Sequence, residues 1–70
     1  MTAQPNDDER ARALAEVERE YPGWQAWLGA LAGVVYARRP RTSPPLVVRA
    51  TTADDLRREI EGAERERGLR

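Results

Sequence analysis

The stretch that decides the fold is WQAWLGALAGVVYARR, residues 24–39, because its pattern fits two different structures. As a helix, its apolar residues recur at spacings of three and four and form one face. As two strands, Trp24, Ala26 and Leu28 alternate on one side, and a return strand begins after a tight connection. The fold class depends on which of these two structures forms.

Glycine content and side-chain shape favour the hairpin over the helix. Gly29 and Gly33 inside a helix would each cost about 0.8–1 kcal/mol relative to alanine, and the tryptophans, valines and tyrosine of the stretch prefer a pleated surface. The next segment, residues 46–50, has the composition of a strand and needs a neighbour to pair with. We therefore expect strands at about 24–29 and 33–39, with the helix as the alternative because the alanines are good helix formers.

A helix is predicted on each side of these strands. Residues 6–20 begin with a cap signal at Asn6 and carry a thin apolar stripe on one face. Residues 53–67 follow Thr52, a typical N-cap with acidic residues in the first turn. They end before Gly68, which suits a C-terminal cap.

The order of these elements predicts a single small α+β domain. It comprises an N-terminal helix, a three-stranded antiparallel meander and a C-terminal helix packed on the sheet, with residues 1–5 expected to be disordered. Leu56 and Ile60 start an apolar stripe on the C-terminal helix that should cover the sheet. Arg57 and Glu61 are expected to form an i,i+4 pair on the solvent side of that helix.

Charge is unevenly distributed along a chain whose net charge is zero. Residues 1–20 hold six acidic and three basic groups, residues 21–50 hold four arginines and no acid, and residues 51–70 hold six acidic and five basic groups. Zero net charge argues against a general nucleic-acid or anionic-membrane binder. The longest apolar run, residues 24–37, is interrupted by Gln25 and falls short of the roughly 20 residues of a membrane helix, so we expect a cytoplasmic protein.

The residue types that carry most enzyme chemistry are missing. The sequence has no cysteine and no histidine, which excludes disulfides and any ordinary zinc site and leaves Thr42 and Ser43 without a base. Acidic residues all fall in segments expected to be solvated helix faces, and the Gly29–Gly33 spacing lacks the Lys-Ser/Thr of a phosphate-binding loop. The sequence therefore predicts no catalytic residue, no metal site and no cofactor.

Aromatic and arginine residues between the acidic flanks are the candidates for a contact surface. Trp24 and Trp27 are an odd number of residues apart, so a regular strand directs them to opposite faces. One is expected in the core and the other on the open face or under the first helix. The alternative is that both are core residues, because so small a domain has little apolar volume. Exposed tryptophan, tyrosine and arginine are common hot-spot residues. The predicted partner-binding residues are Trp24, Trp27, Tyr36, Arg38, Arg39 and Arg41.

The arginines of this segment need not form one patch. The Pro40–Pro45 loop should bring Arg38 or Arg39 near the start of the third strand, whereas Arg49 should lie near its opposite end. The basic surface would then be less compact than the sequence suggests. Pairing of these arginines with the acidic helices is the alternative to partner binding.

Three segments of the chain resemble the pattern of a known family. They are residues 21–27 (YPGWQAW), residues 33–39 (GVVYARR) and, after a further strand, the start of a helix at residues 54–57 (DDLR). The family is a group of short, uncharacterised actinobacterial proteins with the pattern P-G-W-x-x-W, a short gap and G-x-x-Y-A-x-R. Such proteins are often encoded near helix-turn-helix regulators, which implies a regulatory or accessory role. The resemblance implies no catalytic residues.

Together these features predict a small, non-enzymatic protein-interaction module, accessory to a transcriptional regulator. So short a chain buries only about 60% of its unfolded surface, so either its small core packs unusually well or a second chain completes it, and a homodimer is expected on the second alternative. The alternative is a nucleic-acid-binding module that uses the Arg38–Arg41 loop to hold phosphates beside an aromatic residue.

Overall fold

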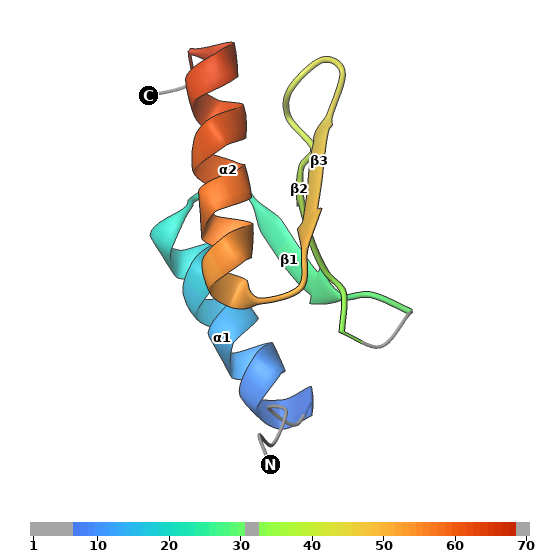
Figure 1. The fold of residues 1–70 in the computed structure, drawn as a ribbon. Helices are drawn as coiled ribbons and strands as arrows, with labels where there is room; N and C mark the ends of the chain where they lie inside the picture. The colour runs from blue at the N-terminus through green and yellow to red at the C-terminus, as the bar shows by residue number, and fades with distance from the viewer. Residues whose placement is uncertain (1–6, 31–32, 69–70) are drawn as a thin grey trace.

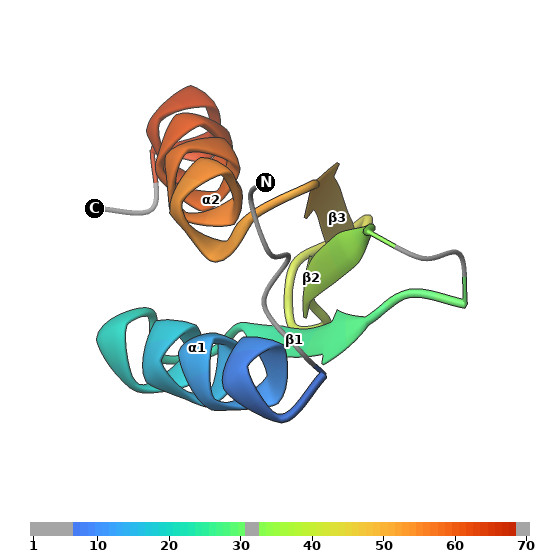
Figure 2. The ribbon, with the colours of Figure 1, turned by 60° about the horizontal axis from the view of Figure 1, so that its bottom comes forward.

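Two helices lie on the same face of a three-stranded antiparallel sheet in the computed structural model, which describes residues 7–30 and 33–68 (Figures 1 and 2). In chain order the elements are α1 (Asp7–Glu20), β1 (Gln25–Leu28), β2 (Val35–Arg39), β3 (Leu46–Ala50) and α2 (Ala53–Arg67). The sheet order is β1-β2-β3, so the predicted α+β meander is confirmed. The expected cap at Asn6 and the expected disorder of residues 1–5 lie outside the described residues.

Glycines shape the β1–β2 hairpin, which forms where a helix was the alternative. The Gly29 N–H donates to the Val34 carbonyl oxygen at 2.8 Å and closes the hairpin. Gly33 has φ +82°, in the left-handed region that favours glycine. β1 begins one residue later than predicted, because the Trp24 N–H donates to the Tyr21 carbonyl oxygen at 3.1 Å and belongs to the preceding turn.

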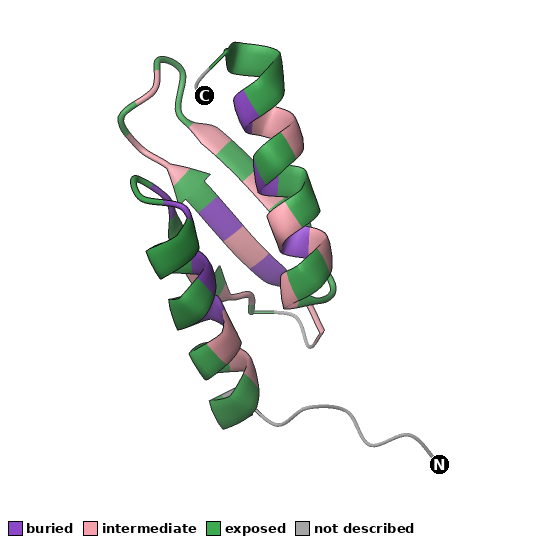
Figure 3. Ribbon diagram, turned by 90° about the vertical axis from the view of Figure 1, so that its left-hand side faces the viewer, coloured by how far each residue is buried: buried purple, intermediate pink, exposed green. Residues whose placement is uncertain are grey.

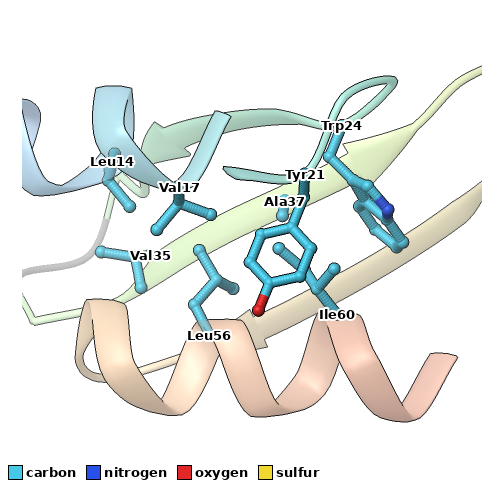
Figure 4. Close-up of a cluster of buried hydrophobic side chains, with 8 residues drawn as sticks. All are labelled: Leu14, Val17, Tyr21, Trp24, Val35, Ala37, Leu56 and Ile60. Atoms are coloured by element: carbon cyan, nitrogen blue, oxygen red, sulfur yellow. The ribbon is translucent and has the colours of Figure 1, made fainter. Parts of the chain in front are cut away.

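The core lies between the two helices and the covered face of the sheet, where the buried positions of α1, β2 and α2 face one another (Figure 3). Leu56 and Ile60, the stripe predicted to cover the sheet, are fully buried. Tyr21 and Trp24 enter from the segment between α1 and β1 and extend towards α2 (Figure 4). The cluster comprises Leu14, Val17, Tyr21, Trp24, Val35, Ala37, Leu56 and Ile60.

Both ends of α2 are capped as the sequence predicts. The Thr52 hydroxyl oxygen accepts the Asp55 N–H at 3.0 Å, which satisfies one of the free amides of the first turn. Gly68 adopts φ 65° at the C-cap, and its N–H donates to the Arg65 carbonyl oxygen at 3.2 Å. These caps define where α2 begins and ends.

Arg57 joins α2 to α1 instead of forming the predicted pair with Glu61. Its Nε lies 2.8 Å from Glu20 Oε1, and its Nη1 lies 2.8 Å from Asp54 Oδ1. Glu61 instead accepts a hydrogen bond from the Tyr21 hydroxyl. The predicted i,i+4 pair is therefore wrong, because this side of α2 packs beside α1 and both side chains find partners across the helix interface.

The link between the helices also changes proton affinities. The hydrogen bond from Arg57 is the main cause that lowers the pKa of Glu20 from its ordinary value of 4.5. The same bond is the main cause that raises the pKa of Arg57. Because Glu20 is at the surface, solvent screens this interaction and its contribution to stability is small.

Replacing Glu20 by glutamine should flatten the acid side of the stability profile. The folded-state pKa of Glu20 lies below its ordinary value of 4.5. The ion pair therefore contributes its stability above the unfolded-state pKa and loses it as the pH falls through the folded-state pKa. Urea unfolding at a series of pH values from neutral to acidic measures this difference between the wild type and Glu20→Gln.

The matched control is Glu59→Gln, which removes an exposed glutamate of α2 and should keep the wild-type profile. An acid profile of Glu20→Gln that runs parallel to that of the wild type would contradict the role of the Arg57–Glu20 pair.

Candidate protein-interaction surface

The sheet face turned away from the helices, here called the open face, carries two rows of side chains. Alternation along each strand places every second residue on this face. In the first row, Trp27 of β1 lies opposite Tyr36 of β2, which lies opposite Arg49 of β3. The adjacent row consists of Gln25, Arg38 and Val47.

Trp27 and Tyr36 of the first row form a stacked aromatic pair. Their ring centroids are 5.7 Å apart, and the planes differ by 13°. Trp27 is 42% exposed, whereas Leu56 and Ile60 in the core are 0% exposed. An indole this accessible on a paired strand is apolar surface that the fold itself does not bury.

Gly29 makes room for the Tyr36 ring. A Cβ at position 29 would lie 2.5 Å from Tyr36 Cε2 and 3.0 Å from the Val34 carbonyl oxygen. The requirement is for space, since the φ of Gly29 is not in the left-handed region. The Tyr36 ring is therefore in contact with both the Gly29 backbone and the Trp27 ring. These two contacts fix the position of the aromatic pair.

Two arginines flank the aromatic pair, and none of the six open-face residues is acidic. Arg38 lies opposite Val47, and Arg49 follows two residues later on the same strand. Such diagonal neighbours across antiparallel strands lie about 7–8 Å apart. As predicted, Arg49 lies near the end of β3 that is remote from the β2–β3 loop, and the register places it beside Tyr36.

Trp24 and Arg39 were predicted in the same contact surface, but the structure places them on the covered side. Trp24 is 3% exposed, and its Nε1–H donates to Glu64 Oε2 at 3.1 Å. Arg39 Nη1 lies 3.5 Å from the same carboxylate oxygen and donates to the Pro22 carbonyl oxygen at 3.4 Å. These two residues link three parts of the chain, namely β2, α2 and the turn before β1. They do not contribute to the open face.

The burial of Glu64 corrects the expectation that every acidic residue lies on a solvated helix face. Glu64 is 4% exposed and continues the buried stripe of Leu56 and Ile60 at four-residue spacing. The buried carboxylate accepts the indole N–H of Trp24, which has no access to water, and the partly exposed guanidinium of Arg39 balances its charge. The stripe spacing was the sequence signal for this position.

The β2–β3 loop contains the remaining predicted residue, Arg41, which is exposed and lies outside the two rows of the open face. The Thr42 hydroxyl donates to the Arg39 carbonyl oxygen at 3.0 Å and accepts the Leu46 N–H at 3.0 Å. Thr42 therefore organises the loop. The structure brings together Trp27, Tyr36 and Arg38 from the predicted set, and adds Gln25, Val47 and Arg49 to them.

No protein-family model matches the chain, and neither the curated proteins nor the solved structures gave a match. Within residues 7–30 and 33–68, no group of three or more acidic, histidine or cysteine residues could hold a metal ion. None of the helices in the described part of the chain is long and apolar enough to cross a bilayer.

A methyl group at Gly29 should destabilise the protein, whereas the same change at Gly62 should stabilise it. Gly29→Ala pushes against Tyr36 and the Val34 carbonyl oxygen, at a cost of about 1–3 kcal/mol. Gly62 lies inside α2 with nothing within 4 Å of an added Cβ, so Gly62→Ala should gain about 0.5–1 kcal/mol.

Urea unfolding of the two variants measures both effects, and near-ultraviolet circular dichroism reports the Trp27–Tyr36 pair. Equal changes of stability in the two variants, or an unaltered aromatic signal in Gly29→Ala, would show that Gly29 does not position Tyr36.

Proposed function

We propose that the protein is a small, non-enzymatic, cytoplasmic interaction module whose open face binds an acidic protein segment. The observation that carries this proposal is the half-exposed Trp27–Tyr36 pair, flanked by Arg38 and Arg49 on a face without an acidic residue. Tryptophan, tyrosine and arginine are the residue types that most often contribute the largest share of binding energy at protein interfaces.

Charge supports an acidic partner. Arginine pairs with carboxylates through two parallel hydrogen bonds, and its stem adds apolar contact beside an aromatic ring. The open face presents two arginines, whereas the acidic residues of the chain lie on the helices. A segment that carries carboxylates around an apolar side chain would therefore meet complementary charge and an apolar contact at Trp27.

The sheet supplies rigidity. Trp27, Tyr36 and Arg49 come from three different strands whose backbones are fixed by the register. Side chains that are held in place before binding lose less conformational entropy when a partner docks. The resemblance to actinobacterial proteins encoded near helix-turn-helix regulators adds a context, and we propose a transcriptional regulator as the source of the acidic segment.

Nucleic acid is the competing partner, because aromatic rings and arginines on an open sheet also bind single strands. The Arg38–Arg41 group predicted for that role is divided by the structure. Arg38 lies on the open face, Arg39 contacts Glu64, and Arg41 lies in the loop. Trp27 and Tyr36 also stack on each other, so one face of each ring is covered and less ring surface is left for a base to stack on. We therefore favour a protein partner.

Selection of random peptides on the immobilised protein tests the proposal. Selected peptides should be enriched in Asp and Glu around one apolar residue, and the double variant Arg38→Ala/Arg49→Ala should lose them. Trp27→Ala should weaken a selected peptide at least about tenfold, as expected for a hot-spot residue.

The matched control is Arg65→Ala/Arg67→Ala, which removes two exposed arginines from the last turn of α2 and should retain binding. Peptides without acidic enrichment, or equal binding by both double variants, would refute the proposal. Salt-dependent binding of a single-stranded oligonucleotide that the Arg38/Arg49 variant loses, with no peptide selected, would replace it by the nucleic-acid function.

A further inference from the structure

We propose that two copies of the chain join through the outer edges of their β3 strands and form one continuous sheet. This inference does not rest on the proposed function, because it concerns the edge of the sheet and not its open face. It follows from the direction of the backbone groups of β3, from the difference between the two sheet edges and from the apolar residues that the edge leaves half covered.

The hairpin bond fixes which backbone groups of β3 point outwards. Gly29 and Val34 share a hydrogen bond, and hydrogen-bonded pairs alternate along antiparallel strands. On β2, Val35 and Ala37 therefore direct their N–H and C=O groups towards β3, where they meet Ala50 and Val48. Val47 and Arg49 alternate with these two residues on β3, so they direct their N–H and C=O groups away from the sheet.

The two edges of the sheet differ in whether other parts of the chain bond to their outward backbone groups. At the β1 edge, the Ala26 N–H donates to the Glu18 carboxylate at 2.8 Å, so α1 covers part of that edge. At the β3 edge, the outward groups of Val47 and Arg49 have no hydrogen bond to any residue in the described part of the chain. Figure 2 shows β3 at the margin of the sheet, with α2 to one side of it. An edge left in this state is a template for another strand.

A second copy fits this edge by symmetry. With a two-fold axis at Val48, Val47 of one copy lies opposite Arg49 of the other, and each such pair exchanges both of its hydrogen bonds. The two Arg49 residues are then diagonal neighbours, about 7–8 Å apart, and are not directly opposite each other, so the register avoids the closest like-charge contact. The whole of β3 takes part, since Leu46 meets Ala50 of the second copy.

The same register completes the apolar contacts at the margin of the core. Leu46, Val48 and Ala50 are only half-buried, although they pack against the core cluster. Val47 is 57% exposed, more than Trp27 at 42%, the other exposed large hydrophobic side chain in the described part of the chain. Pairing places Val48 beside Val48 of the second copy and covers these side chains. A domain of this size commonly gains stability in this way.

Chemical synthesis of the 70-residue chain with an N-methyl group on Val47 tests the edge directly. The methyl group removes an outward donor and leaves the bonds between β2 and β3 intact. The matched control is N-methyl Leu28, whose N–H points outwards from the β1 edge by the same alternation. Light scattering after size exclusion should give a dimer for the wild type and for N-methyl Leu28, and a folded monomer for N-methyl Val47.

Cysteine cross-linking tests the register. The chain has no cysteine, so each single variant reports one position. Val48 lies on the two-fold axis in a non-hydrogen-bonded pair, about 4.5 Å between Cα atoms, within the range that a disulfide spans. Val48→Cys should therefore cross-link on oxidation faster than Val47→Cys, although position 47 is the more exposed.

Three results would overturn the proposal. The first is a wild-type protein that is monomeric over a roughly hundredfold range of concentration. The second is a dimer that survives N-methylation of Val47. The third is faster cross-linking at position 47 than at position 48. A monomeric protein whose β3 edge binds a different protein would also contradict the proposal, because the partner proposed for this edge is a second copy of the chain.

Discussion

The hydrogen bond between the Trp24 indole and the buried Glu64 carboxylate is the interaction around which the structure is arranged. It joins the turn after α1 to the last turns of α2 across the covered face of the sheet, and Arg39 of β2 supplies the balancing positive charge at 3.5 Å. Ala26 and Leu28 of β1 pack against the core cluster, so the pleat of β1 turns Trp27, which lies between them, to the opposite side. The exposed aromatic residue is thus a consequence of which strand residues close the core.

This arrangement of the core leaves two surfaces of the sheet uncovered, the open face and the outer edge of β3. The open face combines Trp27, Tyr36 and two arginines in adjacent rows, since the antiparallel register brings one residue of each strand into line. The outer edge of β3 lies at one margin of this face, whereas Glu18 closes part of the opposite margin by accepting the Ala26 N–H. Joining two copies at β3 would therefore place both open faces on one side of a continuous sheet and leave Trp27 accessible in each copy. Binding of an acidic segment and association of two copies are compatible in this arrangement.

Local signals in the sequence were sufficient for the order and type of the elements. Glycine positions, β-branched residues and the Thr52 and Gly68 caps each act on neighbouring residues, so the meander and α2 could be predicted. The partners of charged side chains could not be predicted, because they depend on how the helices pack. Arg57 bonds to Glu20 on α1, and Glu64 lies under Trp24, each far along the chain from its partner. For the contact surface, Trp27, Tyr36 and Arg38 followed from residue type, whereas Val47 and Arg49 required the β2–β3 register.

The division of the two tryptophans between core and open face is the central claim, and hydrogen exchange of their indole N–H groups tests it in the unmodified protein. The Trp24 Nε1–H is buried and bonded to Glu64, so its resonance should exchange with solvent only when the protein unfolds locally or globally. The Trp27 resonance should exchange at a rate close to that of a free indole, because the side chain is 42% exposed. Comparable protection of both indoles, or slower exchange at Trp27 than at Trp24, would contradict the account.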